Sequence, residues 1–403
     1  MVARLARSDE SMTNSRAGVR EPVYVCGVGA VTGYGWGRKY LWDGMRSGSS
    51  AVVKTSGFSP VFDDDWGYVA RVPDGGRPRD GMSRFSRALR ASAREAVEDA
   101  MERGWEPGPV VGLIHCLVFG EVDMWRELHS MQGYSLNSRK FMQLMPSTPV
   151  SKLMKEHDFH GPCMAVSAMC ASGNSGLLTA KMWMDAGLAT DVLVISTDLS
   201  ATPEACRAFH DVGVAVVDQA PLDACRPFQE GSRGFVFGEA SAALLVSARP
   251  DGAYGKVLGG SMSHDGYHII ALAPDNEQVH RCFVNGLENA GVSAGDVAYM
   301  NAHGSGTDQC DIAEGGMLDT LLTDAKGVYS LKPLVGHCQG AASAIELVSS
   351  FLSLEFGEIP APPKVAAGHP LLLDGCVKRE PGVEVKCSLG MGGHNSVVLL
   401  DAP

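Results

Sequence analysis

Residues 161–187 read GPCMAVSAMCASGNSGLLTAKMWMDAG and carry the signals that decide the fold. The apolar run from 164 to 169 predicts a strand, and the alanine, leucine and methionine residues after it predict a helix. Cys170 stands at the junction. A strand that passes directly into a helix is the repeating unit of α/β proteins, so this stretch predicts that fold class.

The same alternation continues on both sides of this stretch. Residues 84–104 predict an amphipathic helix, because apolar side chains recur every four positions between arginine and glutamate residues. Other apolar runs typical of buried strands lie at 22–29, 110–118, 191–196 and 240–246. A second series of strands and helices begins near residue 255, after the proline- and glycine-rich stretch ARPDGAYG. We therefore expect two similar α/β halves, at 22–253 and 254–403, behind a flexible arm at 1–21.

The composition excludes several classes of protein. The chain has 403 residues, of which 45% are hydrophobic, and a formal net charge of −12. Because nucleic-acid binding needs clustered positive charge, we expect no nucleic-acid partner. No apolar run reaches the roughly 18 residues of a membrane span, and the first residues lack the apolar stretch of a secretory signal. The sequence therefore predicts a cytoplasmic protein with no membrane partner.

Eleven cysteines are spread along the chain without a CxxC pair. This spacing indicates neither a disulfide framework nor a metal site, so we expect no metal ion. Most of them are expected to be small buried hydrophobes. Cys170 differs because it precedes a predicted helix, where unpaired backbone amides favour the thiolate and lower the pKa of the thiol. From this context alone, a reactive nucleophile and a structural cysteine are about equally good interpretations.

Two histidines occupy similar positions in the second half. His303 lies in YMNAHGSGTDQCD (299–311), directly after a predicted strand. His337 lies in SLKPLVGHCQGAASAIE (330–346), before a predicted helix. One histidine at a loop edge is more often structural than catalytic. Two of them, beside small residues and with a similarly placed cysteine, indicate a nucleophile and its acid–base partners assembled from distant segments.

Six blocks of the sequence resemble the β-ketoacyl synthases of the elongating, two-histidine type. Three match the active-site blocks of that family: GPCMAVSAMCASGN (161–174), NAHGSGTDQCD (301–311) and KPLVGHCQGAASAIE (332–346). The others are GVGAVTGYG (27–35), DACRPFQEGSRGFVFGEASAALLV (223–246) and CSLGMGGHNSVVLL (387–400), and all six stand in the family's order. The resemblance implies a thiolase-like fold, with two halves related by a pseudo-twofold axis in five αβαβα layers, and it implies a dimer.

The resemblance also implies an activity, that of a stand-alone β-ketoacyl-[acyl carrier protein] synthase in fatty-acid or type II polyketide biosynthesis. Cys170 would carry the acyl group as a thioester, and a malonyl-type substrate would lose carbon dioxide to give the attacking enolate. His303 and His337 would stabilise that enolate. No bound cofactor is implied, because the phosphopantetheine arm belongs to the acyl carrier protein, which is the expected partner.

Further residues receive roles from the same resemblance. Lys332 and Glu346 would form a polar network behind the histidines. The backbone N–H groups of Cys170 and Met391 would form the oxyanion hole. Ser305 and Thr307 would hydrogen-bond to the pantetheine arm. The acidic carrier protein would dock on basic residues, for which the candidates are Arg84, Arg87, Arg90, Arg139, Lys140 and Arg207.

Four positions depart from the family pattern. Met169 replaces a small residue before the nucleophile, and His394 stands where threonine is usual. Leu389 and Met391 replace two phenylalanines that resemble a gate over the acyl entrance, and their flexible side chains should loosen or reshape it. We therefore predict an unusual acyl chain, as in specialised metabolism.

Two other functions stay open on the sequence. A ketosynthase-fold acyltransferase would pass the acyl group from Cys170 to an alcohol or amine, but such relatives typically alter one of the two histidine blocks, and both are intact here. A non-catalytic partner subunit of a ketosynthase heterodimer would lack the cysteine, which this chain keeps. The expected dimer could be a homodimer or a heterodimer with such a subunit.

Overall fold

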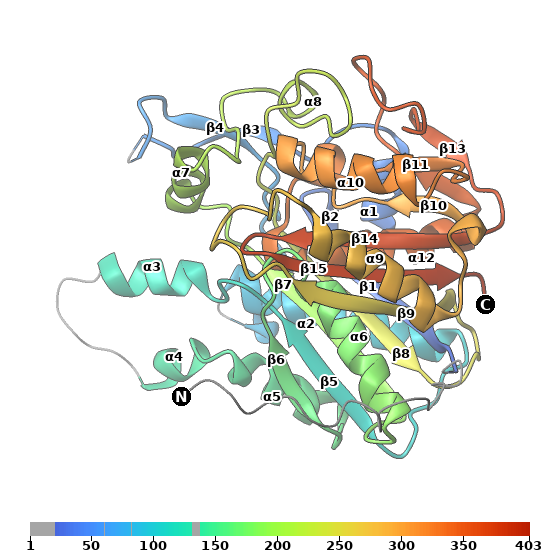
Figure 1. Cartoon of the computed structure of the whole chain (residues 1–403). Helices are drawn as coiled ribbons and strands as arrows, with labels where there is room; N and C mark the ends of the chain where they lie inside the picture. Colours follow the sequence, from blue (N-terminus) through green and yellow to red (C-terminus); the bar gives the residue numbers. More distant parts are fainter. Residues whose placement is uncertain (1–20, 60, 82, 131–137) are drawn as a thin grey trace, which may run out of the picture.

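The computed structural model describes residues 21–59, 61–81, 83–130 and 138–403 (Figure 1). The predicted arm at 1–21 lies outside these ranges except for Glu21. Within the described ranges, no helix is both long enough and apolar enough to cross a membrane.

A mixed sheet of eleven strands runs through the described part of the chain. The first half contributes β1 (Val23–Thr32), β5 (Val111–Cys116), β6 (Cys163–Val166), β7 (Asp191–Asp198) and β8 (Ala240–Ser247), with the short β2 (Gly35–Trp36) paired to β1. The second half contributes β9 (Gly255–His264), β10 (Val297–Asn301), β11 (Gly327–Tyr329), β14 (Val383–Gly390) and β15 (His394–Asp401). The halves meet at antiparallel β1 and β9, where Val23 pairs with Val257.

The strand order is the same in the two halves. When the strands of each half are counted along the chain, their order across the sheet is third, second, fourth, fifth and first. This order is β6-β5-β7-β8-β1 in the first half and β11-β10-β14-β15-β9 in the second. The directions match as well, because the third, second and fourth strands run parallel and the fifth is antiparallel to both neighbours. This shared topology relates the halves by a pseudo-twofold axis, as the resemblance implied.

Helices form layers outside and between the half-sheets. The central layer consists of α6 (Ser172–Asp185) and α12 (Ala342–Phe356), which pack against each other and against strands of both halves. The outer layers are α2 (Arg84–Glu102) on the first half, and α9 (Glu277–Ala290) with α10 (Asp308–Thr320) on the second (Figure 1). The five αβαβα layers of a thiolase-like fold are therefore confirmed.

The two central helices approach each other closely at their first turns. A Cβ atom on Gly173 of α6 would lie 2.5 Å from the backbone nitrogen of Ala344 in α12, so a larger residue does not fit. Every residue of α12 from 342 to 353 is buried, which is typical of a helix surrounded by protein. Gly173 therefore allows the two central helices to pack closely.

The remaining elements connect these layers. They are α1 (Arg38–Arg46), β3 (Val53–Ser56), β4 (Trp66–Val69), η1 (Pro78–Asp80), α3 (Val122–Ser130), α4 (Ser138–Gln143), α5 (Ser147–His157), α7 (Pro203–Asp211), α8 (Pro221–Ala224), η2 (Ala294–Asp296), α11 (Lys332–Val335), η3 (Gln339–Ala341), β12 (Glu358–Pro360) and β13 (Cys376–Lys378).

Candidate active site

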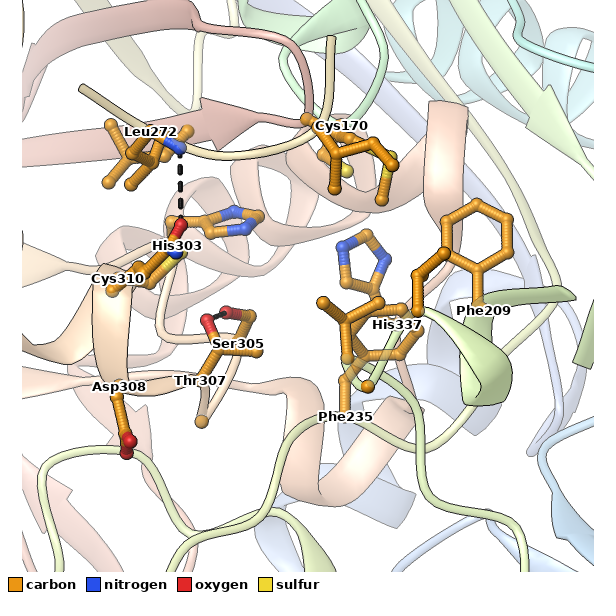
Figure 2. A pocket seen from close by; sticks show the side chains of 18 of the residues that line it. Cys170, Phe209, Phe235, Leu272, His303, Ser305, Thr307, Asp308, Cys310 and His337 are labelled. Carbon is orange, nitrogen blue, oxygen red and sulfur yellow. Dashed lines mark hydrogen bonds between the residues drawn. The ribbon is translucent and has the colours of Figure 1, made fainter. Parts of the chain in front are cut away.

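Three side chains from separate segments meet in one cavity. The sulfur of Cys170 and one ring nitrogen each of His303 and His337 lie within 4.8 Å of one another. The two imidazole rings are 5.6 Å apart between centroids and nearly perpendicular. The cavity has a volume of about 440 Å³, and Figure 2 shows the three side chains together at its wall. The structure therefore brings together the cysteine and the two histidines that the sequence singled out.

The pseudo-twofold topology explains how these side chains meet. Cys170 lies between β6 and α6, and His337 lies between β11 and α12, so each precedes the central helix of its half. Because the first turns of α6 and α12 pack against each other, the loops before them bring the sulfur and the imidazole together. His303 follows β10, which is paired with β11, and completes the group.

The turn that presents Cys170 is tightly held. Met169 has a φ of 50°, in the left-handed region that non-glycine residues adopt only when the surroundings enforce it. The Ser172 hydroxyl accepts the N–H of Ala168 at 2.9 Å and donates to the carbonyl of Met169 at 2.6 Å. The strand expected at 164–169 therefore ends earlier, at Val166. These constraints hold the sulfur at the cavity wall.

The backbone beside His337 decides which ring nitrogen carries the proton. Gln339 has a φ of 45°, and its N–H donates to Nδ1 of His337 at 3.0 Å. Nδ1 is therefore an acceptor, so the proton of the neutral ring is on Nε2. His337 can consequently donate a hydrogen bond through Nε2 to a substrate oxygen.

A buried carboxylate holds the loop of His303. The N–H groups of His303 and Gly304 donate to the two oxygens of Glu314 at 2.6 and 2.7 Å. Glu314 is fully buried on α10 and was not among the residues predicted from the sequence. Its signal was a charged residue at a core-facing helical position, because Cys310, Glu314 and Met317 follow the spacing of one buried face.

A buried network of three charges lies behind the histidines. The carboxylate of Glu346 pairs with Nζ of Lys332 at 2.7 Å and with Nζ of Lys386 at 2.9 Å. Lys332 also donates to the carbonyl oxygen of His303, which ties the network to the histidine loop. The structure thus places Lys332 and Glu346 together, as the resemblance implied, and adds Lys386.

The sequence did not predict a site role for Lys386, because its strand has the pattern of a half-exposed strand. In VEVKCSLG (383–390), glutamate, lysine and serine alternate with apolar residues, which is typical of a strand with one face in water. The structure buries both faces of β14, and Glu384, Lys386 and Ser388 are all fully buried. Partners from other segments make this burial possible, since buried charges need counter-charges.

Burial determines the protonation of the three reactive groups. It lowers the pKa of His303 and of His337 well below the usual value, and the charge of Lys332 acts in the same direction, so both imidazoles are neutral. Burial raises the pKa of the Cys170 thiol to about 11, against the influence of Lys332 and of the Met391 N–H group. The lowered thiol pKa expected from the helix N-terminus is therefore wrong, because the loss of solvation outweighs it.

In the described part of the chain, Cys170, His303 and His337 also form a group whose sulfur and nitrogen atoms lie close enough together to hold a metal ion. One thiolate and two imidazoles are ligands that zinc accepts. However, the charges of Lys332 and Lys386 act on both imidazoles and lower their pKa. The same repulsion opposes a further positive charge at this position.

The other predicted site residues line the same cavity. The hydroxyls of Ser305 and Thr307 hydrogen-bond to each other at 2.9 Å (Figure 2). Leu389 and Met391 also belong to its wall, and the backbone N–H of Met391 acts to lower the pKa of the Cys170 thiol. Met169 and His394, together with Met391, line a second, neighbouring cavity.

Several of the basic residues predicted to dock a carrier protein are engaged within the chain. Arg84 pairs with the buried carboxylate of Glu239 at 2.8 Å. That carboxylate needs the counter-charge, and the docking role of Arg84 stays a prediction. The other predictions stay open: Arg90 pairs with Glu156, Lys140 with Glu127 and Arg207 with Asp211, Arg87 donates to the carbonyl of Gly75, and the Arg139 side chain lies outside the described part.

A buried thiol beside two neutral imidazoles, at the junction of two thiolase-like halves, is an arrangement that suits acyl transfer through a cysteine. Comparison with known proteins supports the same class of enzyme. The family model of the β-ketoacyl synthase N-terminal domain matches residues 20–252, and that of the C-terminal domain matches residues 254–365. The chain belongs to the β-ketoacyl synthase family and is an acyltransferase-type enzyme.

Individual relatives carry related names. The chain is 30% identical over 306 residues to 3-oxoacyl-[acyl-carrier-protein] synthase 2 of Mycobacterium bovis, covering 72% of each protein. It is 29% identical over 337 residues to the protein of that name from Staphylococcus aureus, covering 79% of this chain and 84% of the relative. Among solved structures, a type II polyketide ketosynthase in complex with its acyl carrier protein (AntDE:AntF) matches with a TM-score of 0.83 at 22% identity, covering 95% of this chain and all of that one.

A second structural relative is the ketosynthase ApeO of Xenorhabdus doucetiae in complex with its chain length factor ApeC. It has a TM-score of 0.80 at 21% identity, covering 95% of this chain and 98% of that one. At these identities the structural matches establish the shared fold.

Proposed function

We propose that this protein is a β-ketoacyl-[acyl carrier protein] synthase, which condenses a Cys170-bound acyl group with a malonyl-type substrate. The observation that carries the proposal is the placement of the Cys170 sulfur within 4.8 Å of two neutral imidazoles. Ser305 and Thr307 lie in the same cavity, where they could hydrogen-bond to the phosphopantetheine arm of a carrier protein. The enzyme needs no bound cofactor for this chemistry, because the arm arrives with the substrate.

The first step is thioester exchange. The Cys170 sulfur attacks the thioester carbonyl of an acyl carrier protein, and the thiol proton passes to a neutral imidazole and then to the departing pantetheine sulfur. The N–H of Met391, which in the free enzyme already favours the thiolate, and the N–H of Cys170 would stabilise the oxyanion. The acyl group is then held on Cys170.

The second step forms the carbon–carbon bond. A malonyl-type thioester loses carbon dioxide, and the electron pair of the broken bond becomes an enolate whose oxygen accepts hydrogen bonds from His303 and His337. The enolate carbon attacks the Cys170 thioester and expels the sulfur, which takes up a proton. The products are a 3-oxoacyl carrier protein, carbon dioxide and the free thiol. Neutral imidazoles suit this role because they donate without needing to be charged.

Release of carbon dioxide separates condensation from simple acyl transfer. Replacing His337 with alanine should slow carbon dioxide release from a carboxyl-labelled malonyl carrier protein by about 10²–10³-fold, since loss of one oxyanion donor has an effect of that size. Loading of the acyl group onto Cys170 should fall by less than about tenfold, because loading passes through no enolate. The two rates can be measured separately, by trapped label and by the mass of the intact chain.

The competing acyltransferase function makes the opposite prediction. An acyltransferase would move the acyl group from Cys170 to an added alcohol or amine while malonyl carrier protein stays intact. Observation of that transfer without carbon dioxide would reject the condensation. A partner subunit without activity of its own would form no acyl adduct at all.

We also propose that the protein works as a dimer whose contact includes the edge strand β6. This strand ends the sheet, and its Cys163 and Met164 side chains are exposed. Unpaired edge strands with apolar side chains favour pairing with another chain. The nearby α3–α5 region adds exposed apolar residues, namely Trp125, Phe141, Met142 and Met145. The partner would be a second copy or a ketosynthase-like subunit.

Changing Met164 to lysine should weaken this dimer, because a charge would be buried at the contact. Light scattering should then give the mass of one chain, 42.6 kDa, where the wild type gives that of two. Met101→Lys is the matched control, since Met101 is also exposed but lies on α2, away from β6. A wild-type chain that stays monomeric, alone and with a candidate partner, would contradict the proposal.

We further propose that the enzyme works in the cytoplasm and belongs to specialised metabolism. All eleven cysteines are free, which agrees with a reducing compartment. Leu389 and Met391 give the cavity a flexible wall in place of aromatic side chains. A wall of this kind supports an acyl chain that differs from a saturated fatty acid.

A further inference from the structure

A buried carboxylate lies next to the segment that orients His337. Asp198 is the last residue of β7 and is 1% exposed. One of its oxygens accepts a hydrogen bond from the Ser200 hydroxyl, and the other accepts the N–H of Gly340 at 3.2 Å. Asp198 therefore contacts the backbone of the loop between His337 and α12.

Asp198 is buried without the counter-charge that similar carboxylates have. In the described part of the chain it forms no ion pair, whereas the buried carboxylates of Glu239 and Glu346 both do. Burial raises the pKa of the Asp198 carboxyl to about 7, although the hydrogen bonds from Ser200 and Gly340 act in the opposite direction. Because a buried carboxyl without a counter-charge is unfavourable for the fold, stability by itself does not account for this residue.

The contact of Asp198 falls on a strained part of the backbone. Gln339 has a φ of 45°, and its N–H donates to Nδ1 of His337. The next N–H along the chain, that of Gly340, is the one that Asp198 accepts. A residue other than glycine keeps a left-handed backbone only where its surroundings enforce it. Asp198 is thus one of the contacts that hold Gln339 in the conformation that bonds to the imidazole.

We propose that Asp198 is a positioning residue for His337 and acts through the loop that follows this histidine. By holding the Gly340 N–H, the carboxylate keeps the Gln339 N–H on Nδ1 of His337, so the proton of the neutral ring stays on Nε2. Without that constraint Nδ1 can carry the proton, and Nε2 then faces the enolate oxygen as an acceptor. The inference rests on the proposed function, because the enolate is the species that needs the Nε2–H donor.

Replacing Asp198 with alanine removes the acceptor and should slow carbon dioxide release from malonyl carrier protein by about tenfold, the size expected of one buried hydrogen bond. Loading of Cys170 should fall by less than about threefold, because loading passes through no enolate. Ser200→Ala is the matched control, since the Ser200 hydroxyl donates to the other oxygen of the same carboxylate. It should leave both rates close to those of the wild type.

The pH profile supplies a readout that a merely structural role would not change. An ionised carboxylate accepts a hydrogen bond more strongly than the acid. The wild-type ratio of carbon dioxide release to loading should therefore rise through about pH 7, as Asp198 ionises. Asp198→Asn keeps an acceptor oxygen that does not ionise, so it should restore most of the rate and remove the rise.

The titratable groups that act on Asp198, or on which it acts, are Glu239, Cys170 and Cys338. Burial raises the pKa of both thiols, to about 11 for Cys170, so they stay neutral near pH 7. Glu239 is paired with Arg84. The rise in the ratio is therefore assigned to Asp198 where it disappears in Asp198→Asn.

A wild-type ratio without this rise overturns the inference, as does an Asp198→Ala variant that releases carbon dioxide at the wild-type rate. Equal losses of loading and of carbon dioxide release overturn it too, because they indicate a general structural defect. If Asp198→Ala does not fold, the wild-type and Asp198→Asn profiles decide by themselves. A wild type that loads Cys170 but releases no carbon dioxide rejects the proposed condensation and this inference with it, which distinguishes the two failures.

Discussion

Replacing Cys170 with alanine should abolish acyl loading and lower condensation by at least about 10³-fold, the loss expected when a covalent route is removed. In the proposed mechanism the sulfur accepts the acyl chain, and neither imidazole can replace it as a stable thioester carrier. Intact-mass measurement after incubation with acyl carrier protein should show an adduct on the wild type and none on Cys170→Ala.

Cys376 supplies the control for this experiment. It is exposed and lies on β13, outside the proposed dimer contact, so it could acquire an acyl group without any help from the active site. Cys376→Ala should therefore keep both the adduct and the condensation rate. An adduct that survives in Cys170→Ala and disappears in Cys376→Ala would reject Cys170 as the nucleophile.

Replacing Glu346 with leucine should have the largest effect on stability. Glu346 is the shared counter-charge of Lys332 and Lys386, and all three side chains are at most 1% exposed. Its removal leaves two buried ammonium groups without their carboxylate, a change that typically lowers the free energy of unfolding by about 3–5 kcal/mol. Urea-induced unfolding followed by circular dichroism should show a transition at clearly lower urea concentration.

The exposed ion pair between Lys39 and Asp43 is a suitable comparison, because both of its side chains are more than half exposed. Asp43→Asn should leave the unfolding transition unchanged, since exposed pairs contribute little. The double variant Glu346→Leu with Lys332→Met removes one of the orphaned charges and should recover part of the lost stability. A Glu346→Leu protein as stable as the wild type would show that the three charges are not coupled as the distances indicate.

The fold and the reacting residues could be predicted because their signals are local. The strand-to-helix junction at Cys170 and the small-residue loops around His303 and His337 each occupy a few consecutive positions. The resemblance of six such blocks to one family is specific because the blocks stand in a fixed order. The structure brings the three side chains together and shows the same strand order in both halves.

The supporting residues could not be predicted in the same way, because their environment depends on distant segments. Lys386 alternates with apolar neighbours, which is the pattern of a residue that faces water. In the structure it pairs with Glu346 of another segment. Arg84 has the pattern of a solvated helix face, but Glu239 lies buried beside it. In each case the sequence shows the charge and only the fold supplies its partner.

The sequence by itself determined the α/β fold class, the family and the identity of Cys170, His303 and His337, because local patterns and short blocks encode them. The tertiary structure decided the chemical state of those groups. Burial keeps the histidines neutral and raises the pKa of the thiol to about 11, opposite to what the helix N-terminus alone suggests. Solvation and charge pairing depend on which segments pack together, and that packing exists only in the folded chain.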